Sequence, residues 1–342
     1  MNIIRPIHLS DLECLYQIAV DTGPGFTSLP VDAELLRQRI LHAEQALSQD
    51  IQQSGPARYL FVMQDTETGQ VTGTCGIDAA VGLSSPWYHY RIGTLVHASR
   101  ELNIHNSFQT LYLCNDYTGC SELCTLYLHP GQRHSGNGAL LSKSRFLFMA
   151  EHPTRFAPKI ISELRGFTDQ AGVSPFWEGL GKRFFSMEYS KADYLTGAGN
   201  KVFIAELMPK HSIYIHLLPE DAQAVIAQVH PDTEPARRML EAEGFRYENY
   251  VDIFDAGPTV AAHPEHIRAI QHSRYRRVLI GQVPDNADEY LISNTRLKAF
   301  RCTKSALSEM GDQVTVTAET AQALQVNAGD QVRIVELKRR SS

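Results

Sequence analysis

The sequence predicts a mixed α/β (α+β) protein: a largely antiparallel sheet flanked by helices, with an elaborated second lobe and a small C-terminal β-rich domain. Three observations support this class. Strand-like and helix-like segments alternate up to residue 164. A glycine-rich turn joins one of these strands directly to a helix. Beyond residue 284 the pattern changes to short strands around one short helix. The 342 residues suffice for two or three modest domains, which we place at residues 1–200, 201–283 and 284–342.

The first predicted domain alternates strands and helices. We expect a strand at Asn2–Pro6, a helix beginning near Ser10, a helix at Asp32–Gln53, a hairpin of Tyr59–Met63 and Val71–Ala80, strands at Thr110–Cys114 and Leu123–Leu128, a helix at Ala139–Met149 and a strand at Lys159–Leu164. The loop Thr22–Pro30 between the first two helices is rich in glycine, proline and hydroxyl groups. Such a loop either covers a substrate or only connects the helices.

The second lobe repeats a local pattern of the first domain. Ser174–Phe185 predicts a short helix that ends at a glycine and enters a strand, and Glu234–Tyr247 predicts the same with a C-cap at Gly244. The two copies indicate either a degenerate internal repeat or an elaborated lobe. In the tail, Pro284–Asp288 reads as a linker, and Val314–Glu336 as strand, short helix, turn and strand, as in a small β-barrel.

Composition excludes several classes of protein. The formal net charge is −6 and the basic residues are dispersed, so a nucleic-acid-binding surface is not expected. No uncharged run approaches 18 residues and the N-terminus lacks a signal-peptide core, so we expect a cytoplasmic protein without a membrane span. The six cysteines form no Cys-x-x-Cys pair, and no histidine pair follows Cys120 and Cys124 at zinc spacing. We therefore expect reduced structural cysteines and no metal site.

The segment Ser121–Leu141 contains the clearest candidate for a binding site. A strand ends at His129-Pro-Gly131, and Arg133-x-x-Gly136-Asn137-Gly138 then opens a helix. A strand, a glycine turn and a helix N-terminus present unpaired N–H groups to an anion such as a pyrophosphate, and Arg133 adds charge.

Paired glycines also occur in ordinary loops. The segment lacks the Gly-x-Gly-x-x-Gly and Gly-Lys-Ser/Thr signatures, which disfavours a Rossmann domain or an NTPase. It resembles the Arg/Gln-x-x-Gly-x-Gly/Ala pyrophosphate loop of the GCN5-related N-acetyltransferase (GNAT) superfamily, and this resemblance implies a GNAT-like fold and an acyl-CoA ligand.

His230 is the histidine that we single out from fourteen. Glu220–His230 predicts a helix that ends at this residue, because Pro231 disfavours the α conformation before it. A helix C-terminus stabilises the imidazolium, which would make His230 a proton donor. A histidine that only caps the helix fits the same pattern.

Longer motifs resemble the bacterial arginine N-succinyltransferase family over nearly the whole chain, less so beyond about Asp288. They are Phe26–Pro30, Pro86–Ser99, Ser121–Leu126, Gly136–Gly138, Leu141–Arg145, Ser174–Trp177, Gly181–Met187, Glu206–His211, Gln228–Pro231 and Gly244–Tyr247. The resemblance implies transfer of succinyl from succinyl-CoA to L-arginine, the first step of arginine catabolism by the succinyltransferase route. It also implies that His230 donates a proton and that Leu126 binds succinyl-CoA. The backbone at Leu126 can pair with the amides of a pantetheine arm.

The charged groups of the two substrates require partners of opposite charge, and the sequence offers several candidates for each without choosing among them. Candidate partners for a guanidinium are Asp116, Glu122, Glu163 and Asp169, and candidates for the succinyl carboxylate are Arg91, Lys143, Arg145 and Lys182. We expect succinyl-CoA as a cosubstrate, no tightly bound cofactor, and no nucleic-acid or membrane partner; a homo-oligomer is compatible with the sequence. A relative that prefers ornithine and an inert sensor of CoA or amino acids are the alternatives.

Overall fold

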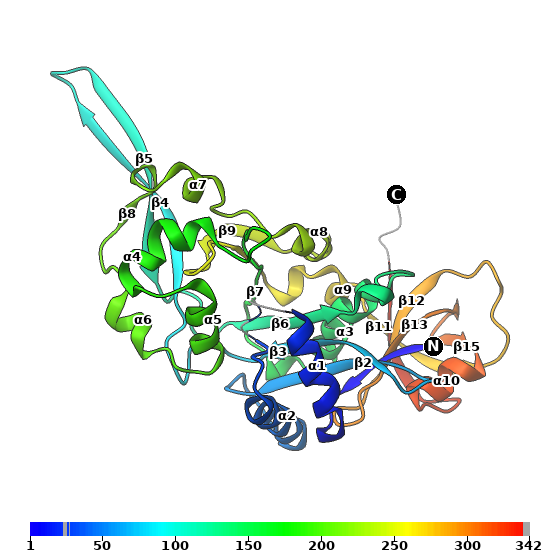
Figure 1. Ribbon diagram of the computed structural model, residues 1–342. Helices are drawn as coiled ribbons and strands as arrows, with labels where there is room; N and C mark the ends of the chain where they lie inside the picture. The colour runs from blue at the N-terminus through cyan, green and yellow to red at the C-terminus, as the bar shows by residue number, and fades with distance from the viewer. Residues whose placement is uncertain (23–25, 27, 338–342) are drawn as a thin grey trace.

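The computed structural model describes residues 1–22, 26 and 28–337. Within this part of the chain sixteen strands join in one sheet, in the order β14-β15-β11-β16-β12-β13-β1-β2-β3-β6-β7-β10-β9-β4-β5-β8 (Figure 1). The strands are β1 Asn2–Pro6, β2 Arg58–Asp65, β3 Val71–Asp78, β4 His89–Ser99, β5 Ile104–Cys114, β6 Ser121–Leu128, β7 Ile160–Glu163, β8 Ile213–Tyr214, β9 Arg246–Val251, β10 Pro258–Ala262, β11 Arg274–Ile280, β12 Glu289–Asn294, β13 Cys302–Ala306, β14 Ser308–Met310, β15 Gln313–Val316 and β16 Gln331–Glu336.

The helices lie on both faces and at the ends of this sheet (Figure 1). They are α1 Leu12–Thr22, α2 Ala33–Ser48, α3 Asn137–Glu151, α4 Lys182–Phe185, α5 Tyr189–Gly197, α6 Val202–Leu207, α7 Glu220–Ala224, α8 Glu234–Glu243, α9 Arg268–Gln271 and α10 Ala318–Leu324. None of the helices in the described residues is both long and apolar enough to cross a membrane. The predicted class, a mixed and largely antiparallel sheet flanked by helices with a β-rich C-terminal part, is confirmed.

Strand β2 shows how the first part of the sheet is buried on both faces. Phe61 and Met63 belong to the apolar cluster around α3, whereas Leu60 and Val62 pack with α1 and α2 on the other face. Successive side chains of a strand point to opposite faces. An almost continuous apolar run in β2 therefore indicates helices on both sides, and α3, which is buried along most of its length, is central to the core.

The hairpin of β4 and β5 extends far beyond the rest of the molecule (Figure 1). Its inner half carries Tyr90 and Leu111, which are buried in a second apolar cluster with α4, α5, α6 and α7. Its outer half is exposed. The second lobe thus packs around the base of the hairpin.

The C-terminal strands continue the sheet, because β13 pairs with β1. Strand β11 runs parallel to β15 and antiparallel to β16, so residues upstream of the predicted tail at 284–342 are hydrogen-bonded to it. The predicted strand, helix and turn of the tail are present as β15, α10 and the turn at Gly329. The division into domains at residues 200 and 283 stays a prediction.

Three local predictions differ from the structure. The helix predicted at Asp32–Gln53 ends at Ser48, with Asp32 as its N-cap. The segment Ser174–Phe185 forms a π-helical turn and α4, but it enters helix α5 rather than a strand, because Ser186 turns in the left-handed region. The helix predicted at Glu220–His230 ends at Ala224, and the backbone of Ala227 has a positive φ that no helix accommodates.

Candidate active site

The centre of the candidate site is the place where β6 and β7 separate. These parallel strands pair only at Ser121 and Glu122 of β6, so the edge of β6 that follows lacks a neighbour on this side. On the other side the register with β3 shifts, and it skips Thr125 and Leu126. Thr125 has a φ of 56°, which bends the strand in the manner of a β-bulge. Leu126 therefore offers backbone groups to a ligand at a bend in the sheet.

The predicted glycine loop follows directly after β6. Gly136, with a φ of 74°, precedes the first residue of α3, and the side-chain Nδ2 of Asn137 donates to the carbonyl of Gln132. The Arg133 Nε donates to the carbonyl of Leu128 at 3.0 Å, which holds the guanidinium close to the end of the strand. The first N–H groups of a helix have no acceptor within it, so this loop can receive an anion. The four predicted loop residues lie together after the end of β6, the strand that carries Leu126. They are Arg133, Gly136, Asn137 and Gly138.

The C-terminal strands also reach this loop. A Cβ on Gly136 would lie 3.6 Å from a methyl carbon of Leu337 and 3.9 Å from the Lys304 Nζ. The same Lys304 Nζ donates to Glu289 at 2.9 Å. The predicted anion loop is therefore bordered by the β-rich tail.

His230 does not end a helix, so the reason given for its imidazolium form is wrong. It precedes a 3-10 turn, and its Nδ1 accepts from the Asp232 N–H at 3.2 Å. Burial, and after it the Arg165 guanidinium, lower the pKa of His230. The ring is accordingly neutral near pH 7 and able to accept a proton.

The backbone around His230 ties it to the end of β7. Its N–H donates to the carbonyl of Arg165 at 2.9 Å, and Gly166 forms an antiparallel bridge with Val229. Val229 and Leu126 both pack against the same apolar cluster. His230 is therefore held beside the residues that follow β7.

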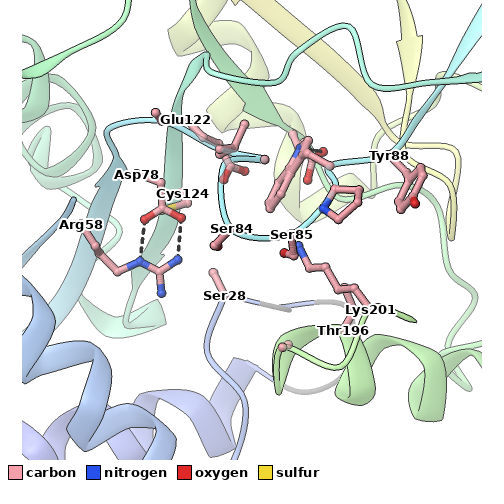
Figure 2. A pocket seen from close by; sticks show the side chains of 18 of the residues that line it. Ser28, Arg58, Asp78, Ser84, Ser85, Tyr88, Glu122, Cys124, Thr196 and Lys201 are labelled. Atoms are coloured by element: carbon pink, nitrogen blue, oxygen red, sulfur yellow. Dashed lines mark hydrogen bonds and ion pairs between the residues drawn. The ribbon is translucent and has the colours of Figure 1, made fainter. Parts of the chain in front are cut away.

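A cavity of about 360 Å³ lies beside β6 and β7. Its lining comes from β2, β3, β6 and β7, from the loops 80–88 and 252–254, and from the segment 196–201 (Figure 2). Four carboxylates line it: Asp78, Glu122, Glu163 and Asp252. Three fixed cations accompany them: Arg39, Arg58 and Lys201. A lining with both signs of charge suits a ligand that is itself zwitterionic.

Most of these charged groups already have partners in the protein. The Arg58 guanidinium pairs with both oxygens of Asp78, as Figure 2 shows, and Arg39 donates to the carbonyls of Ser28 and Gly197. The Lys201 Nζ lies 4.0 Å from the centre of the Trp87 ring. The Glu122 carboxylate points into the cavity from β6 (Figure 2).

Two of the four carboxylates that the sequence proposed as guanidinium partners line the cavity. Glu122 and Glu163 line the cavity, whereas Asp116 is exposed and accepts from the Tyr250 hydroxyl, and Asp169 caps its own loop. The four cations that the sequence proposed for the succinyl carboxylate do not line this cavity either. Lys143 and Arg145 are buried in packing contacts of α3, Lys182 pairs with glutamates on the surface, and Arg91 lies over the Tyr250 ring.

The cavity cations Arg39, Arg58 and Lys201 were missed by the sequence reasoning. Arg58 could have been found, because the predicted hairpin places it opposite Asp78. No sequence pattern marks Lys201, which follows a helix that lies far from β6 along the chain. The loop Thr22–Pro30 contributes Ser28 to the cavity, while its residues 23–25 and 27 are outside the described residues.

Two family models and the relatives of similar sequence carry the same enzyme name. The arginine N-succinyltransferase beta subunit family matches residues 2–269, and the C-terminal domain of that family matches residues 274–336. The arginine N-succinyltransferase of Citrobacter koseri is 52% identical over 338 residues, which are 98% of each chain, and that of Escherichia coli is 51% identical over 339 residues, again 98% of each.

A solved structure is similar over the same extent. Subunit AI of the arginine/ornithine succinyltransferase from Pseudomonas aeruginosa superimposes with a TM-score of 0.92 at 39% sequence identity, covering 99% of both chains. Sequence and structure agree along the whole chain, the β-rich C-terminal strands included. This chain belongs to the arginine N-succinyltransferase beta subunit family.

Proposed function

We propose that the protein transfers the succinyl group of succinyl-CoA to the α-amine of L-arginine, which yields N2-succinyl-L-arginine and CoA. The observation that carries this proposal is the identity of 51–52% over 98% of the chain with relatives named arginine N-succinyltransferase. The glycine loop that follows β6 and the cavity of mixed charge beside β6 and β7 support it independently.

Succinyl-CoA binds where β6 and β7 separate, as a cosubstrate, and leaves after each turnover. Its pyrophosphate lies on Arg133, Gly136, Asn137 and Gly138, where helix α3 begins. The pantetheine arm pairs with the backbone at Leu126, in the manner of an added strand. The bulge at Thr125 then bends β6 beside the thioester.

His230 handles the proton of the transfer. The arginine nitrogen attacks the thioester carbonyl carbon, a tetrahedral intermediate forms, and the C–S bond breaks as the carbonyl is restored. The neutral His230 takes the proton that the attacking nitrogen must lose and delivers it to the departing thiolate. It is the proton donor in the second half of the reaction because it was the acceptor in the first.

A second candidate acceptor is ornithine. The Pseudomonas aeruginosa relative that superimposes on the chain is an arginine/ornithine succinyltransferase. Ornithine offers the same α-amine, but its side chain is shorter and ends in an ammonium group. The preference between arginine and ornithine depends on the distance between the reacting α-amine and the protein group that binds the cationic end of the side chain.

A thiol-release assay tests the proposal. Succinyl-CoA and acetyl-CoA are each offered with arginine, ornithine and lysine, and the product is identified by mass. We expect succinyl-CoA with arginine to be the fastest pair. Replacement of His230 by glutamine should lower kcat by about 10²–10⁴ and leave CoA binding unchanged. Absence of turnover with every pair would reject the enzymatic function, and unchanged activity of H230Q would remove His230 from the mechanism.

A further inference from the structure

We propose that the cavity between β6, β7 and the segment 196–201 binds the cationic side chain of the acceptor amino acid, with Glu122 as its direct ligand (Figure 2). This inference rests on the proposed function and identifies the part of the site that would select arginine. It does not involve the CoA half of the site.

Glu122 differs from the other carboxylates of the cavity in having no protein donor. Asp78 is paired with Arg58. Glu163 accepts from the Trp87 indole at 3.0 Å and lies 2.7 Å from the His89 Nε2. Asp252 accepts from two backbone N–H groups of its own loop. Glu122 is only 6% exposed, yet no hydrogen bond or ion pair joins its side chain to another of the described residues.

A buried carboxylate without a donor is unfavourable, since it loses its water and gains nothing in return. Glu122 therefore requires a ligand that brings donors and a positive charge. A guanidinium supplies both in one plane, with paired N–H groups that match the two oxygens of a carboxylate. The neighbouring Glu163 increases the attraction for a cation because it contributes a second negative charge.

Four charged groups act on the Glu122 carboxylate. They are Asp78 on β3, Glu163 on β7, Arg58 on β2 and Lys201 on the segment after α5. Burial, followed by Glu163 and Asp78, raises the pKa of Glu122 well above its ordinary value, while Arg58 and Lys201 oppose this shift. A cationic ligand acts in the same direction as Arg58 and Lys201, because it favours the charged carboxylate over the protonated form.

The position of Glu122 on β6 sets the length of the acceptor. Glu122 lies four positions before Leu126, which corresponds to at most roughly 13 Å along a strand. The thioester and the attacking α-amine lie near the bend at Thr125, so the remaining distance is left for the side chain of the acceptor. An extended arginine side chain carries its charged end in this direction, and the shorter ornithine reaches less far.

The first experiment compares arginine with L-citrulline, which has the same shape but an uncharged end. The Glu122→Gln variant keeps the size of the side chain and removes its charge. We expect its KM for arginine to rise by about 10- to 100-fold, and its preference for arginine over citrulline to fall by a similar factor. The KM for succinyl-CoA should change by less than about threefold, which also shows that the variant is folded. Glu122→Asp, which retracts the charge, should lie between the two.

Asp116→Asn provides the matched control, because Asp116 was an equal candidate in the sequence but is exposed outside the cavity. Its KM for arginine should stay as in the unchanged protein. Calorimetry adds a readout that does not require turnover. Arginine titrated into the CoA complex should bind about 10- to 100-fold more weakly to E122Q than to the unchanged protein.

Three outcomes would overturn the assignment. The first is an unchanged KM for arginine in E122Q, and the second is a rise in the KM for succinyl-CoA instead, which would place the acyl group in the cavity. The third is equal affinity of both proteins for arginine in calorimetry. Each of these can be seen only when the unchanged protein acylates or binds arginine, whereas failure of the proposed function would appear in the unchanged protein itself.

Discussion

Replacement of Glu243 by alanine should be among the most destabilising single changes in the transferase part of the chain. Glu243 is the last residue of α8, and its carboxylate is 1% exposed. It accepts from the Arg268 Nε and Nη2 at 3.1 and 2.7 Å, and from the Ala269 N–H at 2.8 Å. The Lys143 Nζ is 3.0 Å from the same carboxylate. One side chain thus joins α3, α8 and α9.

The expected size follows from what the substitution leaves behind. Removal of the carboxylate buries Lys143 and Arg268 without their counter-charge, and breaking a buried pair in this way costs about 3–5 kcal/mol. Lys143 and Arg268 also donate to the carbonyls of Leu337 and Glu336, so the attachment of β16 weakens as well. At about 2 °C per kcal/mol for a chain of this size, Tm should fall by roughly 6–10 °C.

Glu241 on the same helix provides the control. It pairs with Arg237 at 2.9 Å, but both side chains are about one-third exposed, and such a pair contributes only about 0.3–0.5 kcal/mol. Differential scanning calorimetry should show a Tm within about 1 °C of the unchanged protein for Glu241→Ala. Glu243→Gln, which keeps the size and one acceptor oxygen, should fall between the two. A Tm for Glu243→Ala no lower than that of Glu241→Ala would refute the reasoning.

Three further changes test the charges around the site and the core. Arg165→Gln should move the acidic limb of the kcat/KM profile to higher pH, because Arg165 lowers the pKa of His230; Arg165→Lys should not, and an unmoved limb in Arg165→Gln would contradict the assignment. Burial, followed by Arg155 and Arg333, lowers the pKa of His152 to about 4. The unfolded chain therefore takes up this proton first, and stability should fall on the order of 3 kcal/mol between pH 6.5 and 4; urea unfolding should show a smaller fall for His152→Gln, and an equal fall would exclude this source. Arg133→Glu should weaken CoA binding in calorimetry while Arg133→Lys largely keeps it, and unchanged affinity in Arg133→Glu would remove Arg133 from the phosphate site.

Local sequence patterns were sufficient wherever neighbouring residues decide the structure. The strand-like runs Tyr59–Met63 and Val71–Ala80 predicted the hairpin of β2 and β3, and the glycines at 136 and 138 predicted the turn before α3. The left-handed Gly244 after α8 was predicted for the same reason, since a helix that ends in this way needs a residue without a side chain. These features depend on residues a few positions apart.

Prediction from the local sequence was wrong where contacts with distant segments determine the backbone conformation. Glu220–His230 has the composition of a helix, but Val229 bridges to Gly166 and Ala227 donates to the carbonyl of Ala256, and these contacts unwind the segment after Ala224. The state of His230 changed with it, from the charged end of a helix to a neutral ring beside Arg165. A propensity summed over one segment cannot include such partners.

The sequence by itself determined the strand, glycine loop and helix of the proposed acyl-CoA half, because these residues are continuous in the chain and each follows from local chemistry. Only the tertiary structure decided the proposed acceptor half. Glu122, Glu163, Asp78 and Lys201 come from segments up to more than a hundred residues apart, and they meet because β3, β6 and β7 are neighbours in the sheet. Of four equivalent carboxylates in the sequence, burial without a partner separates Glu122 from the rest, and burial is a property of the folded chain alone.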